Sequence, residues 1–189
     1  MAVAFGVGAN VTPATGTSFG ISITVSGTNP VLLLTTGMNG NPGATPTVTW
    51  SLGGSLSLIK GGNYTTGYFG YIFALAAPAA GAGTVNVSWP TSQPYVGYAA
   101  VFSGADQTTP CPVADGVGQF FTTDSSPITM TPANLTANDA SFGSAVGTTN
   151  TTPLGVAQTD AYLTTTVPKF QVGYSLGTTA LSSSHTVAF

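Results

Sequence analysis

The feature that most constrains this chain is an alternation of apolar and small polar side chains with a period of two residues. Phe19, Ile21, Ile23 and Val25 alternate with serine, threonine and glycine. Such a period is typical of a half-buried β-strand, because successive side chains of a strand point to opposite faces of its sheet. Shorter runs of the same kind predict further strands at residues 48–52, 56–58, 68–75, 85–89, 96–102, 120–123, 128–131, 142–146, 170–176 and 187–189.

Clusters of turn-forming residues separate these runs. They lie at residues 37–43, 61–63, 90–94, 125–127 and 148–153. Turns at intervals of roughly 8–12 residues are typical of sandwiches and jelly rolls. The 25 glycines and 13 prolines also argue against any long helix. We therefore predict an all-β, jelly-roll-like antiparallel β-sandwich, with residues 1–189 forming a single domain.

One predicted strand is apolar on both faces. Phe69, Tyr71 and Phe73 alternate with a second set that includes Tyr68 and Ile72. This pattern indicates either a central strand covered on two sides or a strand with one face docked on a neighbouring subunit.

The chain is unusually poor in charge. Only 4% of its residues are charged, its net charge is −3, and Lys60 and Lys169 are its only basic residues apart from one histidine. Nucleic acid is therefore not expected as a partner, because a site for phosphates needs several clustered cations. The most apolar stretch, residues 68–82, is interrupted and too short to cross a bilayer, so we expect no membrane partner. The one cysteine, Cys111, excludes an intramolecular disulfide.

No group of residues predicts catalysis, a metal or a cofactor. Residues 16–20 match the Gly-x-Ser-x-Gly motif around Ser18, but that motif needs a turn from a strand into a helix, and here a strand pattern follows. His185 is the only histidine, and the aspartates are dispersed, so neither a metal site nor a carboxylate pair is indicated. We expect no cofactor, no metal site and no enzymatic activity.

Aromatic residues are the candidate ligand-binding or interface residues. Trp50, Tyr64, Trp89 and Tyr95 could form a platform on which the apolar faces of sugar rings stack. Most aromatic residues of the chain occupy alternating strand positions, which favours a role in the core or in a subunit interface over a role in ligand binding.

Residues 98–110, Tyr-Ala-Ala-Val-Phe-Ser-Gly-Ala-Asp-Gln-Thr-Thr-Pro, resemble a known family motif, a hydrophobic strand followed by SGxDQTTP. The family comprises Thr/Gly-rich β-sandwich domains of concanavalin-A-like jelly-roll character, found in bacteriophage virion proteins and bacterial surface proteins. Residues 47–52 and 70–89 also resemble its strands, so the likeness covers roughly residues 30–115. Family members usually close with one further apolar strand, which this chain lacks after Phe189.

The resemblance implies a structural virion protein of a bacteriophage. Isolated β proteins usually protect sheet edges with charges, so a charge-poor surface favours a subunit buried by its neighbours. We expect a capsid decoration protein bound to the major capsid protein and to copies of itself, with a trimer favoured and with residues 68–80 or the termini buried only on assembly. Residues 1–16 show no secretory leader, so assembly in the host cytoplasm and location in the virion are expected. The alternatives are a tail or fibre protein and a lectin-like module that binds glycans; an enzyme ranks third.

Overall fold

The computed structural model describes residues 2–63, 67–108, 127–128, 138, 140–147, 159–164, 169–176 and 185–186. Within these residues the fold is an all-β antiparallel sandwich, as predicted, and it contains no helix. The strands are β1 (Ala4–Val25), β2 (Val31–Asn39), β3 (Thr47–Trp50), β4 (Ser57–Asn63), β5 (Tyr68–Ala76), β6 (Gly81–Ser103), β7 (Pro127–Ile128), β8 (Ala140–Gly147), β9 (Thr159–Thr164), β10 (Lys169–Leu176) and β11 (His185–Thr186).

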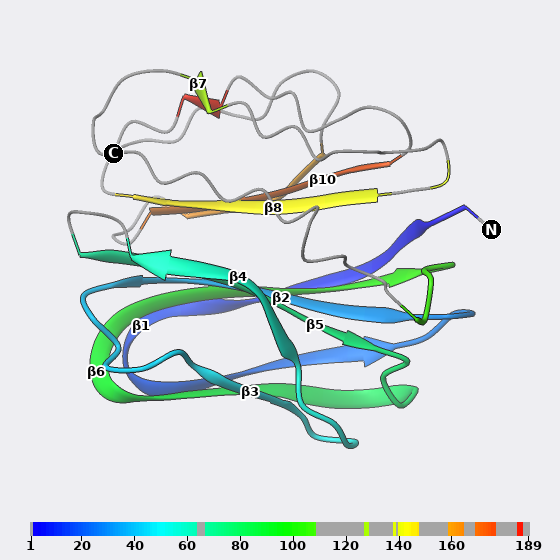
Figure 1. Cartoon of the computed structure of the whole chain (residues 1–189), viewed down its shortest axis with the longest axis horizontal. Coiled ribbons are helices and arrows are strands. Elements are labelled where there is room, and N and C mark those ends of the chain that lie inside the picture. Colours follow the sequence, from blue (N-terminus) through cyan, green and yellow to red (C-terminus); the bar gives the residue numbers. More distant parts are fainter. Residues whose placement is uncertain are drawn as a thin grey trace.

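Two long strands organise the fold. β1 has 22 residues and β6 has 23, and they pair antiparallel along almost their whole length. Figure 1 shows this two-stranded ribbon turning back on itself at one end of the molecule. At the bend the register jumps from Gly16 opposite Gln93 to Ser18 opposite Ser88, so several β6 residues face one β1 residue. Such a bulge bends a strand sharply, and it carries the ribbon from one layer of the sandwich to the other.

The bend creates two layers from one sheet. The central layer consists of residues 4–16 of β1, residues 93–103 of β6, and strands β2, β5 and β4, in that order. The outer layer consists of residues 18–25 of β1, residues 81–88 of β6, and β3. A separate sheet of β8, β10 and β9, the C-terminal sheet, packs on the other side of the central layer (Figure 1).

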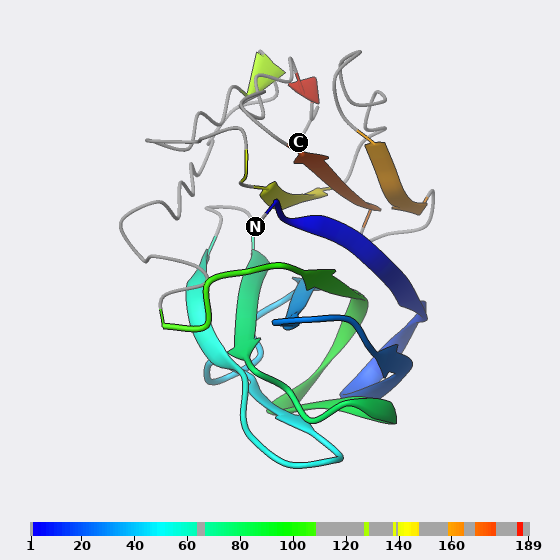
Figure 2. The same cartoon turned by 90° about the vertical axis from the view of Figure 1, so that its right-hand side faces the viewer.

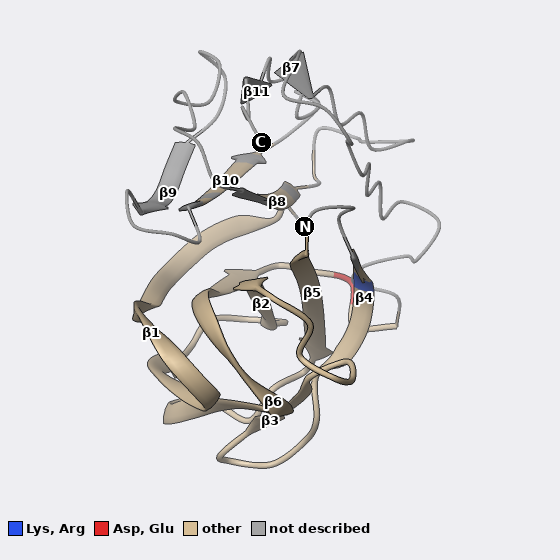
Figure 3. Ribbon diagram, turned by 90° about the vertical axis from the view of Figure 1, so that its left-hand side faces the viewer, with Lys and Arg blue, Asp and Glu red and all other residues tan. Residues whose placement is uncertain are grey.

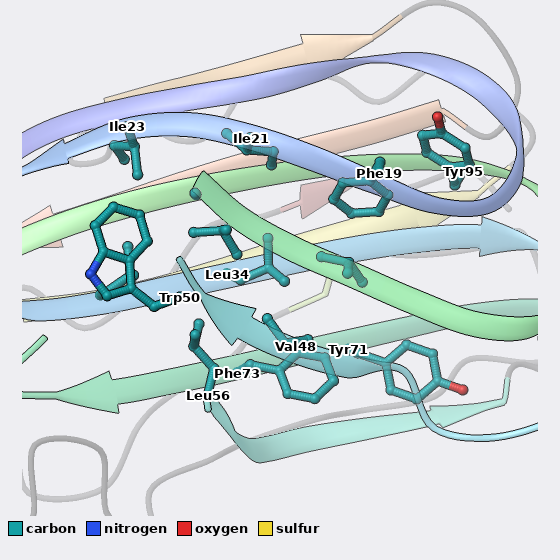
Figure 4. Close-up of a cluster of buried hydrophobic side chains, with 14 of the residues drawn as sticks. Phe19, Ile21, Ile23, Leu34, Val48, Trp50, Leu56, Tyr71, Phe73 and Tyr95 are labelled. Carbon is teal, nitrogen blue, oxygen red and sulfur yellow. The ribbon is translucent and has the colours of Figure 1, made fainter. Parts of the chain in front are cut away.

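The first of two apolar cores fills the space between the central and outer layers (Figure 4). The alternating apolar residues of β1, from Phe19 to Val25, meet Leu34 of β2 and Phe73 of β5 there. β3 and β6 contribute further members, including Val48, Trp50, Val85 and Val87.

The second core lies between the central layer and the C-terminal sheet. Phe102 of β6 and Leu33 of β2 pack there with Phe170 and Val172 of β10, and both β10 side chains are 0% exposed. The hydroxyls of Thr35 and Ser144 also form a hydrogen bond across this boundary.

The two-faced strand β5 is covered within the chain. Phe69, Tyr71 and Phe73 point into the first core, while Tyr68 and Ala74 point into the second. This arrangement confirms a central strand covered on two sides. The expectation that residues 68–80 are buried only on assembly is therefore wrong for this strand, because the C-terminal sheet supplies the cover.

Two predicted turns lie in strands instead: residues 90–94 are part of β6, and residues 61–63 end β4. The predicted turn at residues 37–43 begins three residues later, because β2 extends to Asn39, and Gly40 and Gly43 then have φ values of 114° and 85°. Pro90 lies at the bend of β6, where the regular ladder with β1 is interrupted, and Pro94 lies next to the bend, opposite Thr15 of β1. Gly53 and Gly54 form a further turn between β3 and β4, with φ values of 115° and 97°.

Candidate interaction surface

The predicted aromatic platform is not a surface in this fold. Trp50, Trp89 and Tyr95 are 2%, 5% and 8% exposed and belong to the first core. Figure 4 shows Trp50 and Tyr95 among the side chains between the two layers. Tyr64 lies outside the described residues.

Each of these buried rings has a structural partner. The Trp50 indole Nε1 donates a hydrogen bond to the carbonyl oxygen of Ala79 at 3.0 Å. Tyr95 stacks on Phe19 with a centroid distance of 5.0 Å, and Trp89 meets Tyr95 edge-on at 5.3 Å. A ring must present a free face to stack on a sugar, so the idea of an exposed platform is wrong for these three residues, which hold the layers together instead.

The candidate catalytic residues are not assembled into a described site. Ser18 lies exposed in the extended strand β1, opposite Ser88 of β6, rather than at a turn into a helix. His185 pairs with Ile128 through the backbone of the short strand β11, and its side chain lies outside the description. Asp106 accepts a hydrogen bond from the backbone N–H of Thr108 at 2.8 Å, which closes a local turn.

Within the described part of the chain, no three His, Cys, Asp or Glu residues come together in a way that could hold a metal ion. The same residues include no helix long and apolar enough to cross a membrane.

The outward side of the outer layer carries an unusual set of side chains. In each of its three strands, every second residue faces outward, away from the first core. These outward residues are small and uncharged on all three strands. We call this surface the hydroxyl face; it consists of Ser18, Gly20, Ser22, Thr24, Thr47, Thr49, Thr84, Asn86 and Ser88, all exposed or half-buried.

Cross-strand pairing aligns these residues into rows. Ser88 of β6 lies between Ser18 of β1 and Thr47 of β3, and Asn86 lies between Gly20 and Thr49. Paired residues on one side of an antiparallel sheet lie close together, so the rows form a continuous neutral surface of hydroxyl and amide groups. The signal for this surface in the sequence is the polar half of the alternation, which by itself indicates only the solvent side of a strand.

Charge is nearly absent from the central and outer layers. Between residues 2 and 105 the sequence has one charged residue, Lys60 on β4. Figure 3 accordingly draws almost all of the described ribbon in the colour of uncharged residues. Burial raises the pKa of Tyr68, Tyr71 and Tyr98, with a further rise at Tyr98 from Tyr174, so these phenols add no charge near neutral pH.

Two of the edges of these layers are protected. β4 carries Lys60 together with a bulge between Leu58 and Lys60, and both features discourage pairing with another strand. β3 is covered along its free side by the loop that follows it: Leu56 donates a backbone hydrogen bond to Val48 at 3.0 Å. Thr49 forms a further bridge to Ser55.

The third edge, β1, is protected along only part of its length. Figure 2 shows β1 running down one side of the molecule, from beside the C-terminal sheet to the outer layer. Among the described strands it pairs only with β6. Its first part has Pro13 and register shifts after Phe5 and Val11, whereas residues 18–25 form an uninterrupted ladder with residues 81–88 and carry no charge.

Comparison with protein-family models, curated proteins and solved structures found no match to this chain.

Proposed function

We propose that this chain is a structural virion protein of a bacteriophage and that it acts as a capsid decoration protein. In this role it binds the outside of the head shell through non-covalent contacts with the major capsid protein and with copies of itself, and it stabilises the shell without chemistry. Its place is then the virion, assembled in the host cytoplasm.

The observation that carries the proposal is the uncharged hydroxyl face. It lies on a fold whose two described cores are covered within the chain itself. Surfaces that stay in water usually hold about 25–35% charged residues, which keep proteins apart. Here a whole sheet face has none, and its small side chains allow close approach of another protein backbone. Such a face suits permanent contact with a neighbour, where hydrogen bonds to hydroxyls and amides replace those to water.

The sequence resemblance also supports a structural role in a virion. Of the segment that carries it, residues 98–110, the described residues 98–108 form the end of β6 and the turn after it, and their backbone is bonded to the β1–β2 loop. Ala105 donates a hydrogen bond to the carbonyl oxygen of Asn29, and Gly104 donates one to that of Thr28. The described part of the motif therefore links the end of β6 to the β1–β2 loop, which is a structural role.

Glycan binding is the weaker alternative. It depended on exposed aromatic rings, and three of the four candidates are core residues. A lectin-like role would have to use the hydroxyl and amide groups alone, without the ring stacking that usually orients a sugar.

The test is binding to capsid shells from the phage that encodes the chain. We expect the purified protein to sediment with shells at a fixed ratio and to raise the temperature at which they rupture. Ser88→Lys places a charge in the middle strand of the hydroxyl face and should reduce binding at least about tenfold, since an unpaired charge buried in an interface is strongly unfavourable. Ala44→Lys, which adds the same charge to an exposed loop, is the matched control and should bind normally.

Folded wild-type protein that neither sediments with the shells nor changes their rupture temperature would overturn the proposal. Equal binding by Ser88→Lys and wild type would show that another surface makes the contact.

A further inference from the structure

The open part of β1 has the features of a strand that pairs with another strand. Residues 18–25, which we call the edge segment, are bonded to β6 on one side, and no described strand occupies the other side. In an antiparallel sheet the backbone N–H and C=O groups on a free side point outward and can bond a further strand. The segment reads Ser-Phe-Gly-Ile-Ser-Ile-Thr-Val, which is rich in residues that favour strands.

The other edges of the central and outer layers carry features that hinder pairing with a further strand, and the edge segment does not. β4 is guarded by a lysine and a bulge, β3 by the loop that folds beside it, and the first part of β1 by Pro13 and two register shifts. The edge segment has none of these features. Its outward side chains, such as Gly20 and Ser22, are also too small to block an approaching strand.

We propose that the edge segment pairs antiparallel with the edge segment of a second copy of this chain, which joins the two outer layers into one continuous sheet. The pair has a two-fold axis perpendicular to the sheet, so each residue faces a residue on the same side of the sheet. Buried residues then lie opposite buried residues, and hydroxyl-face residues lie opposite hydroxyl-face residues. With the axis at Ile21, for example, Gly20 faces Ser22 and Phe19 faces Ile23.

Charge selects a second copy as the occupant. In a two-fold contact a charge near the axis would lie close to its own like charge, and the segment has no charge at all. A different protein that recognises its partner by charge would find no charged group on this strand to bind. The pattern of side chains also matches between the two copies, because both place apolar residues on one side of the joined sheet and small polar residues on the other.

The contact is expected to be weak in dilute solution. The apolar side chains of the segment are already buried, with Ile21 at 1% and Val25 at 1% exposed, so pairing adds mainly backbone hydrogen bonds. Copies held side by side on a shell would pair far more readily, since fixing them raises their effective concentration. That consequence rests on the proposed function, whereas the pairing itself does not.

The experiment measures the native mass of the protein by sedimentation equilibrium over a wide range of concentration. Wild type should show a reversible monomer–dimer equilibrium. Ser22→Lys and Ser22→Asp should each raise the dimer dissociation constant at least about tenfold, because the two like charges of a pair would lie close together near the axis. Ala44→Lys, which adds the same charge to an exposed loop outside the edge segment, is the matched control and should dimerise like wild type.

A mixture of the two Ser22 variants completes the test. The lysine introduced in one copy attracts the aspartate introduced in the other, so the mixed pair should regain the affinity of wild type or exceed it, a result that misfolded variants would not give. In wild type the backbone amides of residues 18–25 should also exchange with solvent more slowly as the dimer forms. Monomeric wild type at every concentration, or dimers that the Ser22 changes leave intact, would overturn the inference.

The two proposals fail separately. Dimers that ignore capsid shells would leave the edge pairing standing and remove the decoration role. Monomers that bind shells in the wild-type ratio would do the reverse.

Discussion

Replacing Phe170 by alanine tests whether the C-terminal sheet is an integral layer of the fold. Phe170 is 0% exposed and lies on β10, where it packs against residues of the central layer such as Phe102 and Leu33. Loss of a fully buried phenyl ring removes its transfer free energy and leaves a cavity, which together cost about 3–5 kcal/mol. With a urea slope of about 2–3 kcal/mol per molar, the midpoint of unfolding should fall by about 1–2.5 M.

The assay is urea unfolding followed by tryptophan fluorescence at low protein concentration. Both tryptophans lie in the first core, between the central and outer layers, whereas Phe170 belongs to the second core. A fall in their transition therefore requires that the C-terminal sheet unfolds together with the rest. Leu176→Ala on the same strand is the control; Leu176 is 45% exposed, and its removal should change stability by about 0.5 kcal/mol or less.

An unchanged tryptophan transition in Phe170→Ala would refute this reasoning. The C-terminal sheet would then be a cover that separates from the central layer independently, and the second face of β5 would be available to a partner after all.

The remaining tests probe single contacts. Burial raises the pKa of Tyr98 above its ordinary value of 10.0, so the folded state holds this proton more tightly than the unfolded state does. The free energy of unfolding should therefore be unaffected by Tyr98 below about pH 10 and fall above it, and urea titrations of Tyr98→Phe should show a smaller fall. A Cβ at Gly97 would lie 2.7 Å from Cζ of Phe19, so Gly97→Ala should lower stability by about 1–3 kcal/mol, and an unchanged urea midpoint would contradict that contact. A double-mutant cycle of Thr35→Val and Ser144→Ala should give a coupling of about 0.5–1.5 kcal/mol, whereas zero coupling would mean that the two hydroxyls do not bond.

The alternation in the sequence was enough to predict the fold class and most strands of the two cores. It worked because the chain has strands with one polar side, such as residues 18–25, and a two-faced strand whose pattern indicated cover on both sides. It did not find β2, whose Val-Leu-Leu-Leu-Thr-Thr run is buried on both sides and so does not alternate. The first part of β1 was also missed, since bulges and Pro13 interrupt its period.

Tertiary structure decided what the local sequence could not. Pro90 and Pro94 predict a turn by propensity, yet the pairing of β6 with β1 continues on both sides of the bend. The burial of Trp50, Trp89 and Tyr95 depends on the outer layer folding over the central one, which spacing alone left open between a core, an interface and a ligand site. Strand pairing also decides where an edge lies: among the described strands, residues 18–25 of β1 have a neighbour on one side only, which their own alternation does not show.

The most direct test of the proposed role is the number of copies of this chain in purified virions, measured by quantitative mass spectrometry against the major capsid protein. The decoration role predicts a fixed ratio to the capsid protein that corresponds to many copies per head. A few copies per particle would place the chain in the tail or its fibres, and its absence from the particles would contradict a structural role in the virion.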